Sequence, residues 1–406
     1  MKDTVNIGII GLGGRGTGLL EMILKMEDVT VLGVCDLYAD RANNGAMLVQ
    51  NAKGNTPICS RAYQEILACP EIDAVVIASA WESHIPIAMD AMKAHKYVGM
   101  EVGGAYSVQA CFDLVKTSEE THMPCMLLEN CCYGRTELMV LNLVKQGLLG
   151  EIAHCSGGYH HDLRNEVAFG EQNRHYRLRN YQNRNCENYP THELGPIAKV
   201  LHLNCGNRML SLSSFASKAV GMTQYIKNNR ISDLTDMNFE QGDVVTTVIK
   251  CAKGQTIVLT LDTTLPRAYS RGFCVRGTKG MYEEQTDSVF LDGIHDKFDF
   301  NWREQWGNAK EYYEKYDHPI WQEFLKAGIE AGHGGIDWIV FRAFFESVKS
   351  ETQTPIDVYD AAAWMSISCL SEQSLSMGGI PVAIPDFTNG AWLYHNDKGT
   401  GNYSLD

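Results

Sequence analysis

The strongest constraint on the fold is a glycine-rich turn close to the N-terminus. The apolar run Val5–Ile10 leads directly into a stretch that fits the pattern G-x-G-x-x-G and then into a helical stretch. Its first glycine permits a tight turn, its second lets a pyrophosphate approach the backbone, and its third allows the helix to pack on the strand. The start of that helix also offers unpaired N–H groups to a phosphate. We therefore predict a dinucleotide site lined by Gly11, Gly13, Gly14, Arg15 and Gly16.

An acidic residue further along indicates which dinucleotide is bound. Asp36 directly follows the predicted strand Val29–Cys35 and lies twenty residues beyond Gly16. A carboxylate in this place accepts hydrogen bonds from the ribose hydroxyls and repels a 2′-phosphate, so the sequence favours NAD over NADP. Arg41 lies nearby and works weakly against that preference.

The first third of the chain alternates apolar runs with amphipathic stretches. This pattern predicts a parallel, doubly wound sheet with right-handed crossovers, and hence an NAD-binding Rossmann domain over residues 1–127. The strands are expected at Val5–Ile10, Val29–Cys35, Ala74–Ser79, Tyr97–Val102 and Pro124–Leu128, and the helices at Gly18–Met26, Arg61–Ala68, Pro86–Ala94 and Val108–Glu119.

Residues 128–406 follow a different pattern, which predicts a substrate-binding α+β domain with a mostly antiparallel sheet. Val244–Cys251 and Thr256–Leu261 read as a hairpin, and Phe273–Arg276 and Gly280–Glu284 flank a second tight turn. Further elements are a strand at Glu151–Tyr159 and helices at Thr136–Gly147 and His192–Leu203. The segment His175–Glu187 is dense in Arg and Asn, so we expect a polar loop or surface helix there, and residues 380–406 are expected to fold back over the body.

Charge and cysteine content narrow the function classes. A formal net charge of −14 argues against binding to nucleic acid or anionic membranes. Thirteen cysteines without a C-x-x-C pair predict reduced, buried thiols. No apolar run of about twenty residues is present, so no membrane span is expected. The start of the chain favours a cytoplasmic protein, although removal of a signal peptide would leave a similar start.

No metal site is expected. Zinc would need clustered ligands at helical or hairpin spacing. His160 and His161 are adjacent on a predicted strand, so their side chains face opposite sides and do not converge on one ion.

Three segments after the dinucleotide motif resemble the Gfo/Idh/MocA oxidoreductase family. They are Ala80-Trp81-Glu82-Ser83-His84, Met100-Glu101-Val102-Gly103 and Leu128-Glu129-Asn130. The resemblance implies that Trp81, His84, Glu101 and Asn130 contact the cofactor. It also exposes departures from typical sugar dehydrogenases, because Val102 replaces their proton-accepting lysine. His192 and Pro196 likewise replace the Asp and His found four residues apart in those enzymes.

The same departures are similar to glycoside hydrolase family 109, the NAD-dependent α-N-acetylgalactosaminidases. The matching segments are Asn130–Tyr133, His161–Arg164, Tyr189–Pro196, Arg267–Arg271 and Gly332–Asp337, with one mismatch at Glu193, where members usually have Gly. The resemblance implies a glycosidase in which NAD is recycled: oxidation at sugar C3, elimination across C1 and C2, addition of water and re-reduction. It also implies a homo-oligomer, in which an open face of the antiparallel sheet would form the contact between subunits.

The candidate catalytic residues are His192, Tyr269 and Tyr189. Histidine titrates near neutrality, and a tyrosine becomes an acid or base when neighbouring cations lower its pKa. Each also has a structural interpretation as a packed or stacking ring. The candidate substrate-binding residues are Tyr133, His161, Arg179, His333 and Asp337; the last two could instead form a helix cap. A dehydrogenase of sugars or inositols and a cofactor-binding sensor remain as alternative functions.

Overall fold

The computed structural model describes residues 2–295, 304, 306–328, 333–394 and 401–405. It divides into two compact units that interleave in sequence. The first unit comprises Met1–Tyr133, Phe324–Ala362 and Asp397–Asp406, and the second comprises Gly134–Glu323 and Ala363–Asn396. The boundary expected between residues 127 and 128 does not anticipate this interleaving.

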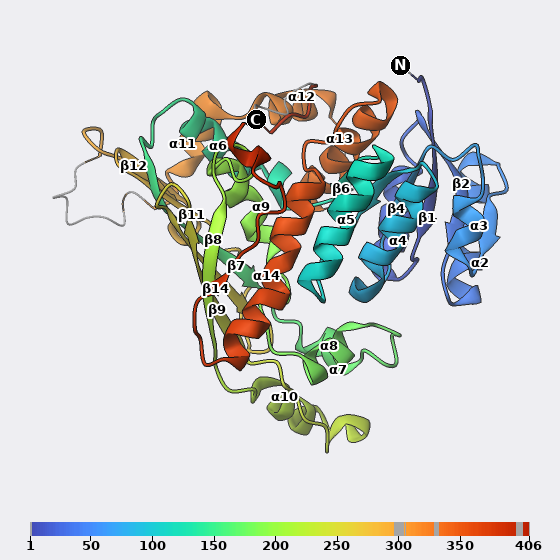
Figure 1. Ribbon diagram of the computed structural model, residues 1–406, viewed down its shortest axis with the longest axis horizontal. Helices are drawn as coiled ribbons and strands as arrows, with labels where there is room; N and C mark the ends of the chain where they lie inside the picture. The colour runs from blue at the N-terminus through green and yellow to red at the C-terminus, as the bar shows by residue number, and fades with distance from the viewer. Residues whose placement is uncertain (1, 296–303, 305, 329–332, 395–400, 406) are drawn as a thin grey trace. The chain divides into compact units, whose positions relative to one another are not determined.

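The first unit contains a six-stranded parallel sheet with the strand order β3-β2-β1-β4-β5-β6 (Figure 1). All residues of β4 are buried, as expected for a parallel sheet that is covered on both faces. The strands are β1 (Val5–Ile10), β2 (Val29–Cys35), β3 (Ile58–Ser60), β4 (Ala74–Ile77), β5 (Tyr97–Met100) and β6 (Cys125–Leu127). The predicted Rossmann architecture is confirmed.

The helices of this unit correct several expected boundaries. They are α1 (Gly14–Ile23), α2 (Ala39–Lys53), α3 (Tyr63–Leu67), α4 (Trp81–Lys93) and α5 (Val108–Thr121), followed by the short η1 (Asn130–Tyr133). Helix α1 begins inside the glycine motif rather than at Gly18, because Gly14 already has helical backbone geometry. Helix α4 begins five residues before Pro86, and α2 and β3 were not predicted.

Two later segments complete the first unit. η5 (His333–Gly335) and α13 (Ile336–Ser350) belong to it, and Arg342 and Lys349 on α13 both bond to the carboxylate of Asp28. In the described part of the tail, Leu405 is buried and the backbone of Tyr403 accepts a hydrogen bond from Tyr133. The tail therefore folds back onto the body, as expected.

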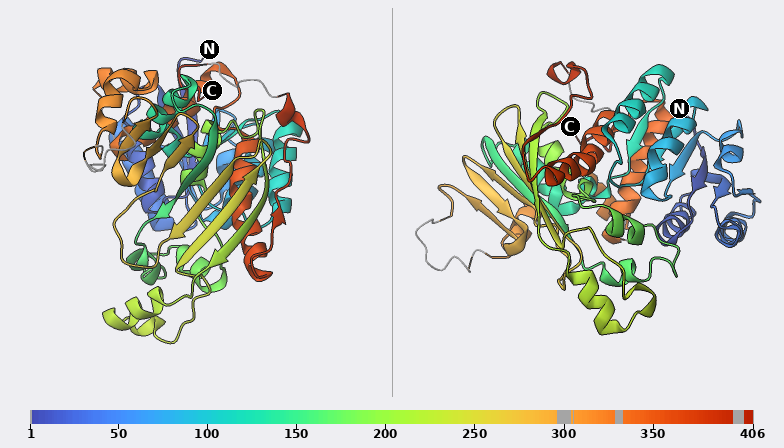
Figure 2. Two further views of the ribbon diagram at one scale, coloured as in Figure 1. Left: turned by 90° about the vertical axis from the view of Figure 1, so that its left-hand side faces the viewer. Right: turned by 60° about the horizontal axis from the view of Figure 1, so that its bottom comes forward.

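The second unit contains an eight-stranded mixed sheet with the order β13-β12-β11-β7-β10-β9-β8-β14 (Figure 2). The pair β7 and β10 is parallel, and each other pairing between neighbouring described strands is antiparallel. The strands are β7 (Ile152–His160), β8 (Met209–Ala216), β9 (Val244–Cys251), β10 (Thr256–Asp262), β11 (Cys274–Gly277), β12 (Gly280–Glu283), β13 (Ser288–Leu291) and β14 (Val382–Ala383). Both expected hairpins and the mostly antiparallel sheet are confirmed.

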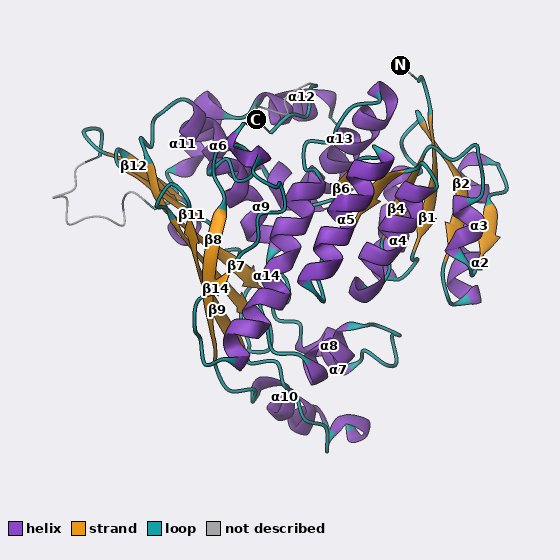
Figure 3. Ribbon diagram, viewed as in Figure 1, coloured by secondary structure: helices purple, strands orange, loops and turns teal. Residues whose placement is uncertain are grey.

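Helices accompany this sheet (Figure 3). Alternate residues of β10 are buried, so one face of the strand is covered and the other remains accessible. Helix α9 packs on β7, and α6 packs on α9. The helices are α6 (Arg135–Lys145), α7 (Arg164–Ala168), α8 (Arg177–Asn183), α9 (Thr191–Val200), α10 (Gly221–Asn229), α11 (Ala309–Tyr316), α12 (Pro319–Ala327) and α14 (Val358–Ser376); α12 and α14 each continue from one unit into the other.

The segment His175–Glu187 contains a surface helix, one of the two alternatives expected there, and one face of this helix is buried. The helix is α8, on which Arg177, Leu178 and Tyr181 are buried. Tyr181 donates a hydrogen bond to Thr263, and this bond satisfies its buried hydroxyl.

Among the described residues, no helix is both long enough and apolar enough to span a membrane.

Candidate active site

The glycine-rich turn in the first unit has the shape that a pyrophosphate requires. Gly11 has a φ of +97°, and a Cβ there would lie 2.5 Å from the backbone of Ala78. A Cβ on Gly16 would lie 2.0 Å from the carbonyl oxygen of Gly11. At Gly13, by contrast, the nearest atom to an added Cβ is a guanidinium nitrogen of Arg41 at 3.6 Å. The first and third glycines are therefore required by the fold, and the second leaves open space in front of the backbone.

Asp36 connects this turn to the second strand. Its carboxylate is buried, and it accepts hydrogen bonds from the backbone N–H of Leu12 at 2.7 Å and of Tyr38 at 2.9 Å. Each carboxylate oxygen keeps a second lone pair that could accept a ribose hydroxyl. The N-terminus of α1 carries no side-chain cap at Gly13, as is typical of helix starts that bind an anion. These residues fit the phosphates and ribose of NAD.

Arg15 lies at the centre of a network that joins three distant parts of the chain. Its guanidinium forms two hydrogen bonds with Asp337, at 2.7 and 2.8 Å, and one with Glu101 at 3.0 Å. Asp337 also accepts from Asn130 at 2.7 Å and pairs with His333 at 2.6 Å. The hydrogen bonds from Arg15 and His333 outweigh burial and hold the pKa of Asp337 well below its usual range, whereas the bond to Asp337 raises the pKa of His333.

The network bears on two expected roles. Each oxygen of the Asp337 carboxylate already has two partners, which fills its usual capacity as an acceptor. The geometry thus favours a positioning role for Asp337 over the expected contact with sugar hydroxyls. The side chain of His333 is 66% exposed and remains accessible to a ligand.

Three expected ligand contacts are buried in the first unit. Trp81 is 3% exposed and packs against Gly103, where a Cβ would lie 2.5 Å from the indole. His84 is 1% exposed and donates from Nε2 to the carbonyl of Ser79 at 2.9 Å, and burial lowers its pKa to about 4. Tyr133 is fully buried, with its hydroxyl bonded to the tail. Their contacts support the turns around them.

The second unit brings together all three candidate catalytic residues. Tyr189 and His192 lie edge to face with ring centres 4.7 Å apart, and both contact the ring of Tyr159. Tyr269 approaches the same ring at 6.4 Å. His161 contacts Tyr159 at 5.4 Å and Tyr269 at 5.2 Å. We call Tyr159, His161, Tyr189, His192 and Tyr269 the aromatic cluster.

Local structure explains why these rings meet. Tyr159 lies near the end of β7 and His161 directly follows the strand, and their side chains meet on the same side. Tyr189 and His192 flank the start of α9, which packs on that strand. The Tyr159 hydroxyl and Nδ1 of His161 are hydrogen-bonded at 2.8 Å. Burial, and next the charge of Arg177, lower the pKa of His161, which favours a neutral imidazole.

Exposure divides the cluster into an accessible and a packed part. Tyr269 is 54% exposed, whereas Tyr159 and Tyr189 are buried. The guanidinium of Arg177 lies over the ring of Tyr189, 5.1 Å from its centre. Arg179, the arginine expected to bind substrate, lies on α8 with an exposed side chain. Sequence reasoning missed Arg177, which contacts the cluster, and Tyr159, although the alternation of a strand places Tyr159 beside His161. The expected contact of Arg179 with substrate stays a prediction.

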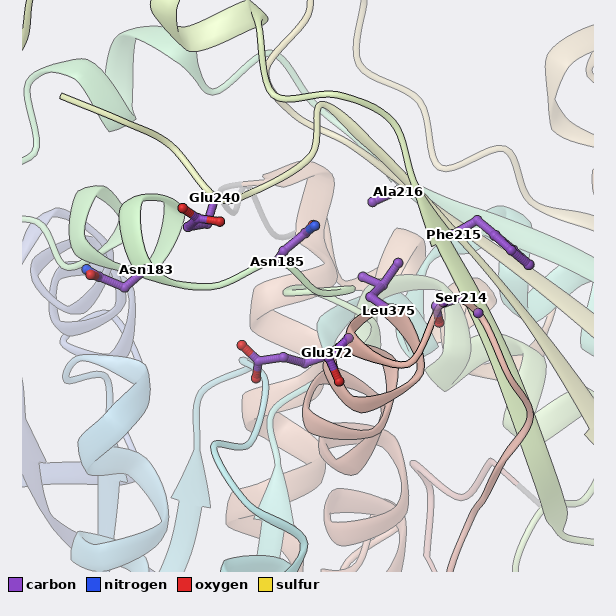
Figure 4. A pocket seen from close by; sticks show the side chains of 11 residues that line it. Asn183, Asn185, Ser214, Phe215, Ala216, Glu240, Glu372 and Leu375 are labelled. Atoms are coloured by element: carbon purple, nitrogen blue, oxygen red, sulfur yellow. The ribbon is translucent and has the colours of Figure 1, made fainter. Parts of the chain in front are cut away.

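A separate cavity of about 480 Å³ also lies in the second unit (Figure 4). It is lined by Asn183, Asn185, Ser214, Phe215, Ala216, Glu240, Glu372, Leu375, Ser376, Gly378 and Gly379. No member of the aromatic cluster lines it, so it is not the candidate active site.

Comparisons with known proteins agree with this geometry. Residues 5–128 match the oxidoreductase family with an NAD-binding Rossmann fold, and residues 133–394 match the C-terminal domain of glycosyl hydrolase 109. The fold is similar to that of apo scyllo-inositol dehydrogenase from Lactobacillus casei, with a TM-score of 0.66, 14% identity and coverage of 95% of this chain and 99% of that one. Levoglucosan dehydrogenase in complex with NADH and L-sorbose gives a TM-score of 0.66 at 16% identity, covering 95% and 100%. The fold and the glycine-rich turn thus define an NAD-binding protein of the Rossmann class.

Curated relatives are considerably closer in sequence. A glycosyl hydrolase family 109 protein of Parabacteroides distasonis is 38% identical over 423 residues, covering 97% of this chain and 89% of the relative. An α-N-acetylgalactosaminidase of Tannerella forsythia is 37% identical over 418 residues, covering 96% and 87%. The chain belongs to glycoside hydrolase family 109 and is an enzyme of that family.

Proposed function

We propose that this enzyme hydrolyses α-N-acetylgalactosaminides with tightly bound NAD as a recycled catalyst. The observation that carries the proposal is the aromatic cluster, in which His192, Tyr189 and Tyr269 converge although they come from separate segments. Proton transfers to and from a sugar require groups within about 2.6–3.2 Å of the reacting atoms. The name of the Tannerella forsythia relative supports the choice of sugar.

The solvent exposure of each ring suggests which catalytic role it has. Tyr269 is the most accessible ring with a hydroxyl, so it is well suited to exchange a proton with a sugar oxygen. His192 is partly exposed, and its imidazole has a ring nitrogen that can accept a proton and return it. Tyr189 packs between Tyr159 and His192 and holds the imidazole in place.

His161 and Tyr159 form a second, linked pair. Their hydrogen bond fixes one nitrogen of the imidazole, which leaves Nε2 to contact a sugar hydroxyl. The flat faces of the cluster offer an apolar surface to the C–H groups of a sugar ring, while the ring nitrogens and hydroxyls contact its oxygens. This combination suits a neutral carbohydrate.

The glycine-rich turn is where we expect the cofactor. Gly13 leaves room for the pyrophosphate, the start of α1 offers N–H groups, and Asp36 contacts the ribose. When bound, NAD would accept a hydride from sugar C3 and later return it. Glu101 and Asn130 hold Arg15 and Asp337 in the network beside this turn, and Trp81 and His84 stiffen the turns at the ends of β4 and β5.

The test measures two products at once. The purified enzyme, without added cofactor, is incubated with aryl α- and β-glycosides, including N-acetylgalactosaminides, while released aglycone and NADH absorbance are followed. We expect many turnovers of aglycone without net NADH, and loss of activity in His192→Ala. His154→Ala, at the far end of β7, is the matched control and should retain activity. A parallel assay supplies a free sugar and added NAD⁺; steady NADH formation there, without aglycone release from the glycosides, would identify a dehydrogenase instead.

A further inference from the structure

A buried group of charges lies beside the aromatic cluster. A nitrogen of the Arg271 guanidinium is 2.5 Å from Oε1 of Glu137, and another is 3.6 Å from Oε1 of Glu193. The side chains of Glu137 and Glu193 are 3% and 1% exposed, and that of Arg271 is 18% exposed. Two carboxyl groups therefore share one guanidinium in a nearly dry environment.

The backbone of β7 is shaped around this group. A Cβ on Gly157 would lie 2.8 Å from Cβ and 3.1 Å from Oε2 of Glu193. Only a glycine at this position leaves room for the glutamate as α9 packs on the strand. Glu193 directly follows His192 in α9, so its close approach to Gly157 lies next to the residue that carries the imidazole.

Counting charges indicates that the group retains a proton. Full ionisation would give two negative charges and one positive charge in a region that is nearly closed to water, and buried net charge is costly. Oε2 of Glu137 is buried and has no hydrogen-bond partner among the described residues, which is costlier for an anion than for a neutral carboxyl group. Burial raises the pKa of Glu137, and the charge of Arg271 opposes this shift without cancelling it.

Other titratable groups face Glu137 from the neighbouring elements. They are His192 from α9, Glu284 beyond β12, Tyr282 in β12 and Tyr313 in α11. The carboxylate of Glu284 accepts hydrogen bonds from the backbone of Arg271 and Phe273, at 3.2 and 2.7 Å. Its negative charge increases the preference of Glu137 for the neutral form.

We propose that Glu137, Arg271 and Glu193 form a positioning group in which two carboxyl groups share one guanidinium and one proton, and that this group holds α9, and with it His192, against β7. The link to catalysis rests on the proposed function of His192. The sharing of a proton does not rest on the proposed function, because it follows from the burial and the charges of the three residues alone. The group touches no reacting atom, so its effect on catalysis passes through His192.

Infrared difference spectra of the whole enzyme test the shared proton directly. We expect the wild type to show a protonated-carboxyl band that both Glu137→Gln and Glu193→Gln remove, because the remaining carboxyl ionises beside Arg271. Burial raises the pKa of Glu187 to about 8, so this residue also gives a protonated-carboxyl band. That band is present in both wild type and variant and cancels in the difference spectrum. If the band persists in either variant, the proposal of a shared proton is overturned.

Urea unfolding provides a second measure. Each single variant keeps one ionised carboxyl beside Arg271 and should shift the midpoint little. The double variant removes both carboxyl groups from beside this mostly buried guanidinium and should lower the midpoint strongly. Additive shifts would contradict the sharing of Arg271. This readout needs no substrate.

The link to His192 is tested by the NMR titration of its imidazole, assigned by its loss in His192→Ala. Glu193→Gln and Gly157→Ala should both move the titration and the pH profile of kcat/KM. Ser156→Ala, on the opposite face of β7, is the matched control and should change neither. An unmoved titration would overturn the positioning role. If the infrared band and the titration behave as expected but no aglycone is released, only the proposed function is rejected.

Discussion

Replacing Gly13 by alanine should separate cofactor binding from folding. Gly13 has φ −66° and ψ −173°, which alanine adopts without strain, and its new methyl group would meet only Arg41 at 3.6 Å. A glycine-to-alanine change at such a site typically stabilises by about 0.4–1 kcal/mol through the unfolded state. The same methyl group would occupy the space through which the pyrophosphate approaches, so we expect NAD to bind at least about tenfold more weakly, a loss of about 1.4 kcal/mol.

The assay compares urea unfolding with and without NAD after the cofactor has been stripped. At a free NAD concentration of about 100 times the wild-type dissociation constant, binding should stabilise the wild type by about 2.7 kcal/mol and Gly13→Ala by about 1.4 kcal/mol. Calorimetric titration gives the two affinities independently. Equal NAD affinities for wild type and Gly13→Ala would refute the argument that the pyrophosphate contacts this turn.

Two other glycines of the same segment are internal controls. A Cβ on Gly18 meets nothing within 4 Å, so Gly18→Ala should stabilise α1 and leave the NAD affinity unchanged. A Cβ on Gly16 would lie 2.0 Å from the Gly11 carbonyl oxygen, and Gly16→Ala should cost about 1–3 kcal/mol or more even without cofactor. A stable Gly16→Ala would mean that the turn can relax, which would weaken the steric argument for Gly13 as well.

Three further predictions concern single side chains. Tyr159→Phe removes the hydrogen bond to His161, and steady-state kinetics should show kcat reduced by about 10-fold or more with unaltered folding by circular dichroism. Arg15→Met leaves the buried Asp337 carboxylate without its guanidinium and should cost about 3–5 kcal/mol in urea unfolding; a cost below about 1 kcal/mol would contradict the network. Burial lowers the pKa of His84 from 6.5 to about 4 in the folded state. The neutral imidazole therefore contributes fully to the free energy of unfolding above the unfolded pKa, and this contribution is lost as the pH falls. Between about pH 7 and pH 4 this should remove up to about 3 kcal/mol, and His84→Asn should reduce that slope, as pH-dependent unfolding would reveal.

The sequence predicts the first unit well where periodicity is strong and fails where it is weak. Buried parallel strands such as β4 read as unbroken apolar runs. β3 has three residues, two of them exposed, so no apolar run marks it. α2 contains Asn43, Asn44 and Gly45, which have poor helix propensity, and tertiary packing overrides that preference.

For the candidate site, motifs identify the important segments better than the contacts of each residue. The motif that contains Tyr189 and His192 and the segment that contains Tyr269 meet at the ring of Tyr159. Trp81 and Tyr133, however, are buried, because a motif retains residues that support a turn as readily as residues that touch a ligand. Burial depends on the packing of distant segments, which one sequence does not reveal.

The clearest case is the segment that ends in Asp337. The resemblance groups it with the sugar-binding motifs, and it follows β7 to β13 of the second sheet in sequence. Its carboxylate nevertheless bonds to Arg15 in the glycine-rich turn and to Asn130, within the first unit. A defect there should therefore appear first as weaker retention of NAD, and the KM for the glycoside should change only as a consequence. Measuring bound NAD in Arg15→Met beside its kinetics separates these two routes, because a substrate-binding defect would leave the cofactor content intact.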